Sequence, residues 1–326
     1  NISNKISLFL ILGISLLLLS CNSSSSTAYV PESSGNINSL TVVMEEKYWS
    51  GELGNQIRDV FAAPYEGLPF DEPKYDLHYI PPKAFSGFAR NSRNVIVFSK
   101  DTIDKINLAK NPWARPQVVA LISGEDPDVM SFYLDENKDL ILRTYSENER
   151  TEKLRRISKS PNKDQDLFGK FEISLDYPSI YSTVKDTTNF LWIEKKVLKG
   201  HLNLIAYTLP IDKDLKTLQK RIPRIRDSIG KLYVPGRLPN SYMITEKAYR
   251  PYYYLTTING LESILTKGTW EVENDFMAGP FVNYIVKDTQ NNRYIVLEGF
   301  AFAPTESKRN YMFELNAIIT TLEITK

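Results

Sequence analysis

The 326-residue chain carries nearly balanced charge, with 40 Lys and Arg against 39 Asp and Glu. This balance provides no basic field for binding nucleic acid. One cysteine and two histidines exclude an intrachain disulfide and a metal site built from several cysteines or histidines. The length and the 42% hydrophobic content suffice for cores in two domains.

The N-terminal residues 1–20 have the pattern of a lipoprotein signal peptide. Lys5 precedes an apolar run over residues 6–19, and the small Ser20 stands directly before Cys21. The run is shorter than the about 20 residues that a membrane span needs, but it suits the core of a signal peptide. We therefore expect Cys21 to become the mature N-terminus and to carry a covalent diacylglycerol and acyl lipid such as palmitate. More than one acyl chain would hold the protein firmly on a membrane of the cell envelope.

A polar tether and a first domain follow the lipid site. Residues 21–37 lack apolar periodicity and predict a flexible tether. Residues 38–160 predict an α+β domain that ends in a long helix, which Asp126 caps and Pro127 begins. Its expected strands are 40–44, 75–80, 95–98 and 117–123, and its expected helices are 49–61 and 126–158.

Residues 165–326 predict a second α+β domain, separated from the first by the turn at 160–164. Apolar strand patterns joined by short turns favour an antiparallel sheet. Asn259-Gly260 is a strong hairpin signal, because both positions of a type I′ turn need positive φ. The expected strands are 171–175, 190–194, 202–209, 242–245, 252–258, 263–272, 281–288 and 294–301, with helices at 215–232 and 307–322. The fold class is thus two α+β domains, each a mainly antiparallel sheet with packed helices.

Few residues of the chain have the types or the pattern of a catalytic site. His78 and His201 lie in a strand and at a turn, where we expect structural histidines. The sequence has no Gly-x-Ser-x-Gly motif and no phosphate-binding Gly-rich loop. It identifies no catalytic residue, no metal ligand and no cofactor other than the lipid on Cys21. Enzymatic activity stays open, and a non-enzymatic role is favoured.

The most unusual stretch is 270–281, where aromatic and Met side chains stand beside turn residues. One interpretation is a strand pair whose Phe276 and Met277 fill the core. The other is a loop that docks a protein partner, with anchors from this stretch and from the Tyr-rich strand 252–258. The candidate partner-binding residues are Trp270, Phe276, Met277, Phe281 and Tyr252.

An alternative function uses carboxylates and tyrosines. Glu271 and Glu273 alternate with apolar residues and share one sheet face, where they would form an acid–base pair if that face lines a cleft. The chain also has 19 tyrosines, which suit stacking against sugars as well as sheet packing. A protein that binds glycan or peptidoglycan, or a carboxylate-dependent hydrolase, is therefore the alternative to a protein-binding or assembly accessory module.

Several motifs of the mature chain are shared with one group of proteins. They are Leu40-Thr41-Val42-Val43 with Trp49 and Gly51, Ile80-Pro81-Pro82 with Phe85-Ser86-Gly87, Arg226-Asp227-Ser228-Ile229-Gly230, Ser241-Tyr242-Met243-Ile244-Thr245, Gly268-Thr269-Trp270-Glu271-Val272, Phe276-Met277-Ala278-Gly279-Pro280-Phe281-Val282-Asn283-Tyr284 and Tyr294-Ile295-Val296-Leu297-Glu298-Gly299-Phe300. Through them the chain resembles an uncharacterised lipoprotein family of Bacteroidetes-type bacteria, domain of unknown function 4837. The resemblance implies no activity, cofactor or catalytic residue.

The resemblance also bears on location and fold. No acidic residues follow Cys21 directly, whereas surface-export signals in such bacteria resemble short acidic runs. We therefore expect the periplasmic face of the outer membrane, with an envelope protein as partner and no nucleic acid. Residues 171–178 and 294–322 resemble the opening and closing elements of the PsbP and Mog1 type of α/β/α sandwich, whose members mostly bind other proteins.

Overall fold

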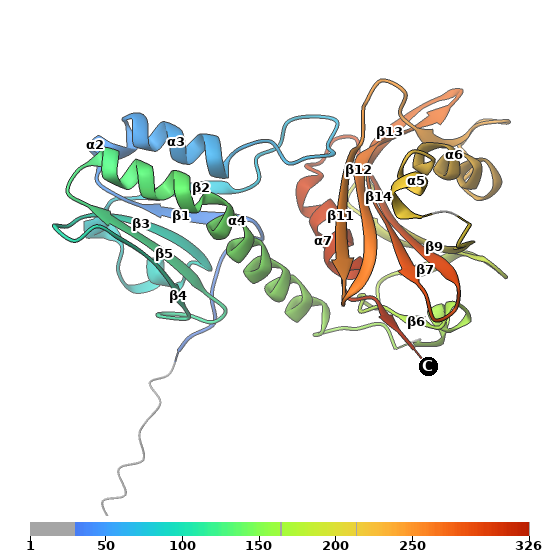
Figure 1. Cartoon of the computed structure of the whole chain (residues 1–326), viewed down its shortest axis with the longest axis horizontal. Coiled ribbons are helices and arrows are strands. Elements are labelled where there is room, and N and C mark those ends of the chain that lie inside the picture. Colours follow the sequence, from blue (N-terminus) through green and yellow to red (C-terminus); the bar gives the residue numbers. More distant parts are fainter. Residues whose placement is uncertain (1–29, 164, 213, 326) are drawn as a thin grey trace, which may run out of the picture. The chain divides into compact units, whose positions relative to one another are not determined.

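The structure is a computed structural model that describes residues 30–163, 165–212 and 214–325. The expected signal peptide, Cys21 and the tether as far as residue 29 lie outside this part of the chain. The described residues form a mixed α+β fold with two larger sheets, which confirms the predicted class (Figure 1). No helix among the described residues is both long and apolar enough to cross a membrane.

The first sheet has the strand order β2-β1-β3-β5-β4. Its strands are β1 (Ser39–Val43), β2 (Asp76–Ile80), β3 (Asn94–Lys100), β4 (Lys105–Lys110) and β5 (Val118–Gly124). Strand β1 runs parallel to β2 and β3, β3 runs parallel to β5, and β4 is antiparallel to β5. The prediction of a mainly antiparallel sheet is therefore wrong here. Strands β3 and β5 are largely buried on both faces, as is typical of parallel strands.

Three helices pack on one face of this sheet. They are α2 (Glu46–Trp49), α3 (Glu52–Phe61) and α4 (Pro127–Ile157). The Asp126 carboxylate accepts the backbone N–H groups of Asp128 and Val129 and so caps α4 as predicted. Apolar side chains of α3 and α4 pack with those of β1, β3 and β5 in one core. The short 3₁₀ helices η1 (Pro82–Ala84) and η2 (Gly87–Asn91) flank Phe85, which packs in a smaller core with Val43, Val95 and Val119.

The second sheet is antiparallel, with the order β10-β12-β13-β14-β9-β8-β7 and with β11 paired to β12. Its strands are β7 (Ser182–Thr187), β8 (Phe190–Val197), β9 (Gly200–Pro210), β10 (Tyr242–Thr245), β11 (Tyr252–Ile258), β12 (Leu261–Glu273), β13 (Asp275–Asp288) and β14 (Arg293–Phe302). Asn259 and Gly260 have φ of 47° and 81°, which confirms the predicted hairpin turn.

Two local predictions in this half are wrong. Of the expected strand 171–175 only the short β6 (Ile173–Ser174) forms; it follows the 3₁₀ helix η3 (Gln165–Phe171) and pairs with β15 (Glu323–Ile324). The expected helix 215–232 is two helices, α5 (Leu215–Gln219) and α6 (Ile222–Tyr233). Pro223 explains the break, because it has no N–H to continue α5 but fits the first turn of α6.

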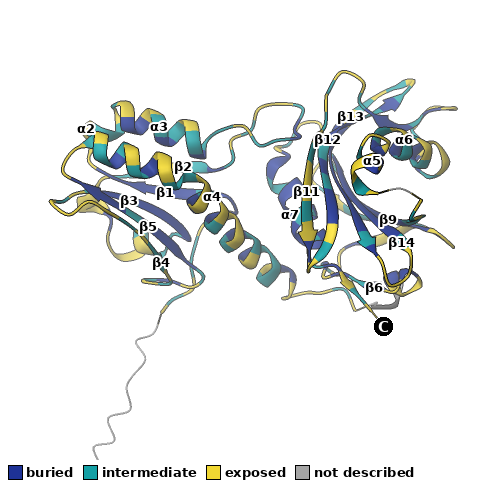
Figure 2. Cartoon of the chain, viewed as in Figure 1, coloured by how far each residue is buried: buried dark blue, intermediate teal, exposed yellow. Residues whose placement is uncertain are grey.

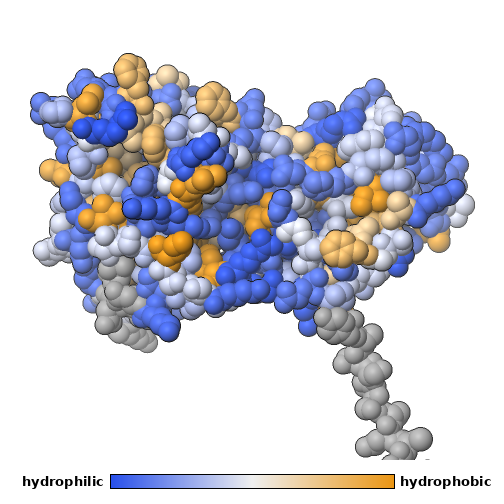
Figure 3. Space-filling view, turned by 180° about the vertical axis from the view of Figure 1, so that it is seen from behind, coloured by the Kyte–Doolittle hydropathy of each residue, from blue (hydrophilic) through white to orange (hydrophobic). Residues whose placement is uncertain are grey.

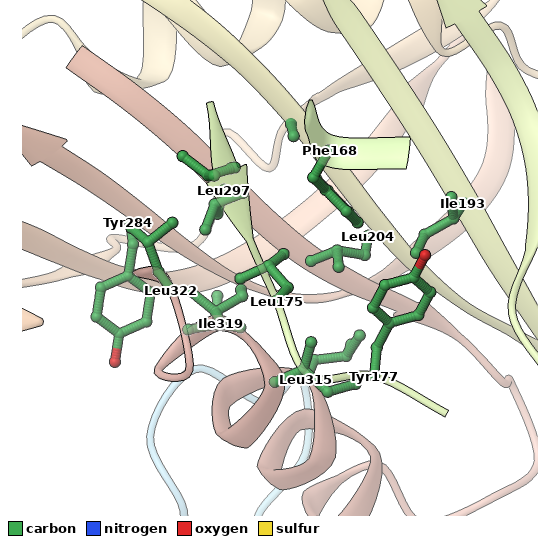
Figure 4. Packing of buried hydrophobic residues seen from close by; sticks show 14 of the residues in the cluster. Phe168, Leu175, Tyr177, Ile193, Leu204, Tyr284, Leu297, Leu315, Ile319 and Leu322 are labelled. Carbon is green, nitrogen blue, oxygen red and sulfur yellow. The ribbon is translucent and has the colours of Figure 1, made fainter. Parts of the chain in front are cut away.

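Helices cover both faces of the second sheet. On one face α5 and α6 pack over Ile205, Tyr207, Ile285 and Val296. On the other face α7 (Arg309–Ile319) packs over a second core, where Leu315 and Ile319 lie against Leu204 and Leu297 (Figure 4). The strands between these layers are mostly buried (Figure 2). This is the predicted α/β/α layering.

A buried ion pair fastens α6 to the sheet. The Arg226 guanidinium donates to both carboxylate oxygens of Glu298 at 2.8 and 2.7 Å, and to Thr245 Oγ1 at 2.6 Å. Asn283 Nδ2 also donates to Glu298, at 2.8 Å. The Arg226 and Glu298 side chains are 2% and 1% exposed, so their charges are compensated by each other rather than by water.

Polar contacts also join the first half of the chain to α7. The Glu72 carboxylate accepts the backbone N–H groups of Lys308 and Arg309 at the start of α7, and the hydroxyl of Ser307. Arg309 donates to both carboxylate oxygens of Asp76, at 3.1 and 2.7 Å. The residues from Glu32 onward form one compact unit. The domain boundaries drawn from the sequence at residues 160 and 165 stay predictions.

Candidate functional site

A pocket of about 210 Å³ lies on the α6 face of the second sheet, beside the segment that follows the end of α6 at Tyr233. Residues 234–237 form one wall. The strands β8, β9, β10, β12, β13 and β14 supply the other lining residues, which are Trp192, Glu194, His201, Asn203, Met243, Trp270, Val272, Met277, Phe300 and Phe302. They share one face because side chains alternate along each strand, and because Asn203 pairs with both Glu194 and Phe300. We call this cavity the aromatic pocket.

Four aromatic rings form the base of the aromatic pocket. The ring centroid of Phe300 is 6.1 Å from that of Trp192 and 5.8 Å from that of Trp270. The Trp270 and Phe302 centroids are 6.3 Å apart. The three pairs are tilted or edge-on, which are favourable arrangements at these distances. The base is therefore an apolar surface built from side chains of three strands.

Polar groups lie at defined points around these rings. Trp192 Nε1 donates to Asn203 Oδ1 at 2.9 Å. His201 Nδ1 lies 3.1 Å from Glu194 Oε2, although not in hydrogen-bonding geometry. Trp270 Nε1 is buried and has no hydrogen-bond partner in the described part of the chain. An unpartnered buried donor is costly, and this N–H lies beside the backbone of Gly279.

The hairpin end of β12 and β13 stands beside the pocket. Phe276 is fully exposed, whereas Met277 is half-buried and lines the pocket. Arg237 donates to both oxygens of Asp275, at 3.1 and 2.8 Å. These hydrogen bonds lower the pKa of the Asp275 carboxyl. The ion pair links the wall after α6 to the hairpin.

Gly279 allows Trp270 to pack at the base of the pocket. The two residues are paired across β12 and β13. A Cβ at position 279 would lie 2.1 Å from the Ala301 carbonyl oxygen and 3.1 Å from Trp270 Nε1. Any side chain there would displace the indole or the neighbouring strand β14.

The structure brings only some of the predicted partner-binding residues together. Trp270, although expected as a contact residue, is 2% exposed and forms part of the pocket base with Met277 beside it. Phe281 is buried below α6, where the Arg226 guanidinium lies 3.5 Å from the centre of its ring. Tyr252 is exposed on β11 and does not line the pocket. The stretch 270–281 forms the end of β12 and the beginning of β13, with Asn274 between them. The alternation of apolar and charged residues from Trp270 to Glu273 belongs to β12.

Glu271 and Glu273 do not line the aromatic pocket. Glu271 Oε1 accepts the backbone N–H of Lys247 at 3.3 Å, and Glu273 Oε2 lies 3.0 Å from Lys247 Nζ. Both carboxylates thus contact the segment after β10. In the described part of the chain no three His, Cys, Asp or Glu side chains are grouped as metal ligands.

Sequence reasoning missed Trp192, Glu194, His201 and Asn203. The sequence did contain a signal. Trp192 and Glu194 are separated by one apolar residue, as are His201 and Asn203, so the two residues of each pair share a strand face. What the sequence does not give is the register, which sets Glu194 opposite Asn203 and His201 opposite Phe302.

Comparisons with known proteins give a family and a weak structural likeness. Ran-binding protein Mog1p from Saccharomyces cerevisiae is 11% identical, with coverage of 48% of this chain and 91% of that chain and a TM-score of 0.33. A mutant of protein Mog1 is 11% identical, with 48% and 92% coverage and a TM-score of 0.31. Such TM-scores carry no argument about function. No curated protein matches the sequence.

Two family models match the chain. Residues 33–158 match a domain of unknown function, DUF8532. Residues 160–321 match the domain of unknown function DUF4837, which confirms the family indicated by the sequence motifs. Residues 160–321 are therefore similar to the DUF4837 family.

Proposed function

We propose that the protein is a lipid-anchored component of the cell envelope that binds a protein partner through its second half. The partner would place an apolar or aromatic side chain in the aromatic pocket, with Phe276 and Met277 beside it. The observation that carries this proposal is a small pocket with an aromatic base, lined by Met277 of a hairpin on which the neighbouring Phe276 is fully exposed. Aromatic side chains in such settings supply much of the energy of protein interfaces.

The size of the pocket supports a side chain as occupant. Sites for drug-sized ligands measure about 300–1,000 Å³, and this pocket measures about 210 Å³. On the face of the molecule shown in Figure 3, apolar side chains form small groups among hydrophilic ones. A compact pocket at a hairpin that carries an exposed aromatic ring fits docking of a short segment better than a broad apolar interface.

A glycan or peptidoglycan ligand is the alternative. It is favoured by the aromatic rings that line the pocket, because such rings stack against sugars. The hydrolase form of this alternative has less support. Glu271 and Glu273 both contact Lys247, and neither lines the pocket.

Crosslinking in living cells, followed by affinity purification and mass spectrometry, tests the docking role. We expect the wild-type protein to recover a defined envelope partner, and the double variant Phe276→Ala/Met277→Ala to lose most of it. Phe88→Ala is a matched control, because Phe88 is also exposed but lies in the first half of the chain. Equal recovery by the double variant and the control would contradict the proposal. Binding to isolated peptidoglycan that Trp270→Phe weakens would support the alternative.

The anchor has its own test. We expect Cys21→Ser to move the protein from the membrane fraction to the soluble fraction, because each buried methylene of the lipid contributes about 0.8 kcal/mol to membrane binding. Ser23→Ala, two residues away, should leave the protein with the membranes. Fractionation followed by immunoblotting measures both. Sedimentation of Cys21→Ser with the membranes would refute a lipid anchor at this position.

A further inference from the structure

A second cavity, distinct from the aromatic pocket, contains an excess of positive charge. It measures about 320 Å³ and is lined by residues of both halves of the chain. The charged side chains in its lining are Lys74, Arg143, Lys267 and Glu66. Three cations therefore face one carboxylate. We call it the cationic cavity.

The single carboxylate does not neutralise these cations. Glu66 Oε2 lies 3.5 Å from Lys267 Nζ and accepts a hydrogen bond from the Tyr254 hydroxyl at 2.8 Å. Neither Lys74 nor Arg143 has an ion pair with another residue in the described part of the chain. Lys74 and Arg143 thus carry two positive charges without a direct ion pair in the described chain, and the nearest carboxylates on α4 are those of Asp139 and Glu147, one turn before and after Arg143.

Lys267 is the most enclosed of the three cations. Its side chain is 24% exposed, and its Nζ lies 5.5 and 5.7 Å from the ring centres of Tyr65 and Tyr254. Burial lowers the pKa of Lys267, the Glu66 carboxylate opposes this effect, and the like charge of Lys74 adds to the lowering. A bound anion would favour the charged form of this amine.

Neutral hydrogen-bonding groups complete the lining. Asn316 uses its Oδ1 to accept the Tyr284 hydroxyl at 2.9 Å, which leaves its Nδ2 group for an acceptor. The exposed Ser146 hydroxyl lies on α4 near Arg143, one turn away along the helix. Cations with additional neutral donors are the usual composition of a site for phosphate or carboxylate groups.

We propose that the cationic cavity binds a small anion with at least two negative charges, carried by phosphate or carboxylate groups. Lys267 and Arg143 contact the anion from opposite halves of the chain, and Lys74 adds charge. This site is independent of the aromatic pocket and of the docking function proposed above.

Isothermal titration of the purified protein with inorganic pyrophosphate and with citrate, at constant ionic strength, tests the proposal. We expect saturable binding of at least one probe, and the probe bound more tightly identifies the anionic group. Arg143→Gln and Lys267→Gln should each weaken binding at least about tenfold, the value of one charge-assisted hydrogen bond. Lys83→Gln removes the same charge from an exposed site elsewhere and should change nothing.

The lowered pKa of Lys267 provides a second readout. At alkaline pH part of this amine is neutral, so binding of the anion should take up protons from the buffer. Titration in two buffers with different ionisation heats measures this uptake, and Lys267→Gln should abolish it. Lack of saturable binding by both probes, or binding that Arg143→Gln and Lys267→Gln leave unchanged, would overturn the proposal. Arg143 is exposed on α4, so its variant keeps the test valid if Lys267→Gln fails to fold.

Discussion

Replacement of Arg226 by Met is expected to lower the free energy of unfolding by about 3–5 kcal/mol. The substitution leaves the Glu298 carboxylate 1% exposed, with Asn283 as its remaining donor. It also removes the donor to Thr245 and the cation over the Phe281 ring. Urea unfolding followed by circular dichroism measures the loss.

Two controls separate the buried charge from a general effect on α6. Arg224→Met changes an exposed residue of the same helix and should stay within about 0.5 kcal/mol of wild type. The double variant Arg226→Met/Glu298→Leu removes both charges and should recover much of the lost stability. A double variant no more stable than Arg226→Met would show that the unpaired carboxylate is not the cause.

Trp270→Ala is expected to cost about 3–5 kcal/mol of stability, the range for removing a large buried aromatic side chain. Trp270 is 2% exposed and packs against Phe300 and Phe302. Phe276→Ala, only six residues away, should change stability by less than about 0.5 kcal/mol, because the ring is fully exposed.

Thermal and urea unfolding of these two variants can be compared directly. A large loss for Phe276→Ala would mean that this ring packs against the protein, which would remove it as a docking anchor. The comparison also shows which substitutions can be used in binding experiments without unfolding the protein. Trp270→Phe keeps a ring in the base, whereas Trp270→Ala confounds binding with folding.

Elements with strong local signals were predictable from the sequence. The Asp126 cap and Pro127 fix the start of α4, and Asn259-Gly260 fixes a hairpin, because these residues have specific backbone requirements. Strands β4 and β7 were not predicted. Both are edge strands with little buried surface: β7 lacks the apolar alternation that identifies a half-buried strand, and β4 shows it only at Ile106 and Leu108.

Strand direction and site geometry depend on pairing between distant segments. The apolar composition of β3 and β5 suits parallel neighbours, but the sequence does not state which strands pair. Trp270 and Met277 were predicted as site residues because the stretch 270–281 has an unusual composition. Glu194 and His201 lie in the same pocket only because of the register between β8, β9 and β14. Residues that reach the pocket only through the strand register can therefore be identified only from the structure.

The contacts of Glu72 with α7 bear on how far the two family-matched segments are modular. Glu72 lies in the segment 33–158, yet it satisfies N–H groups at the start of a helix in the segment 160–321. Helix termini without such partners are destabilised, and Arg309 would also lose both oxygens of Asp76. Separating the two segments would therefore remove these hydrogen bonds and this ion pair from the start of α7. The segment 160–321 alone is therefore expected to be less stable than the same segment in the whole chain.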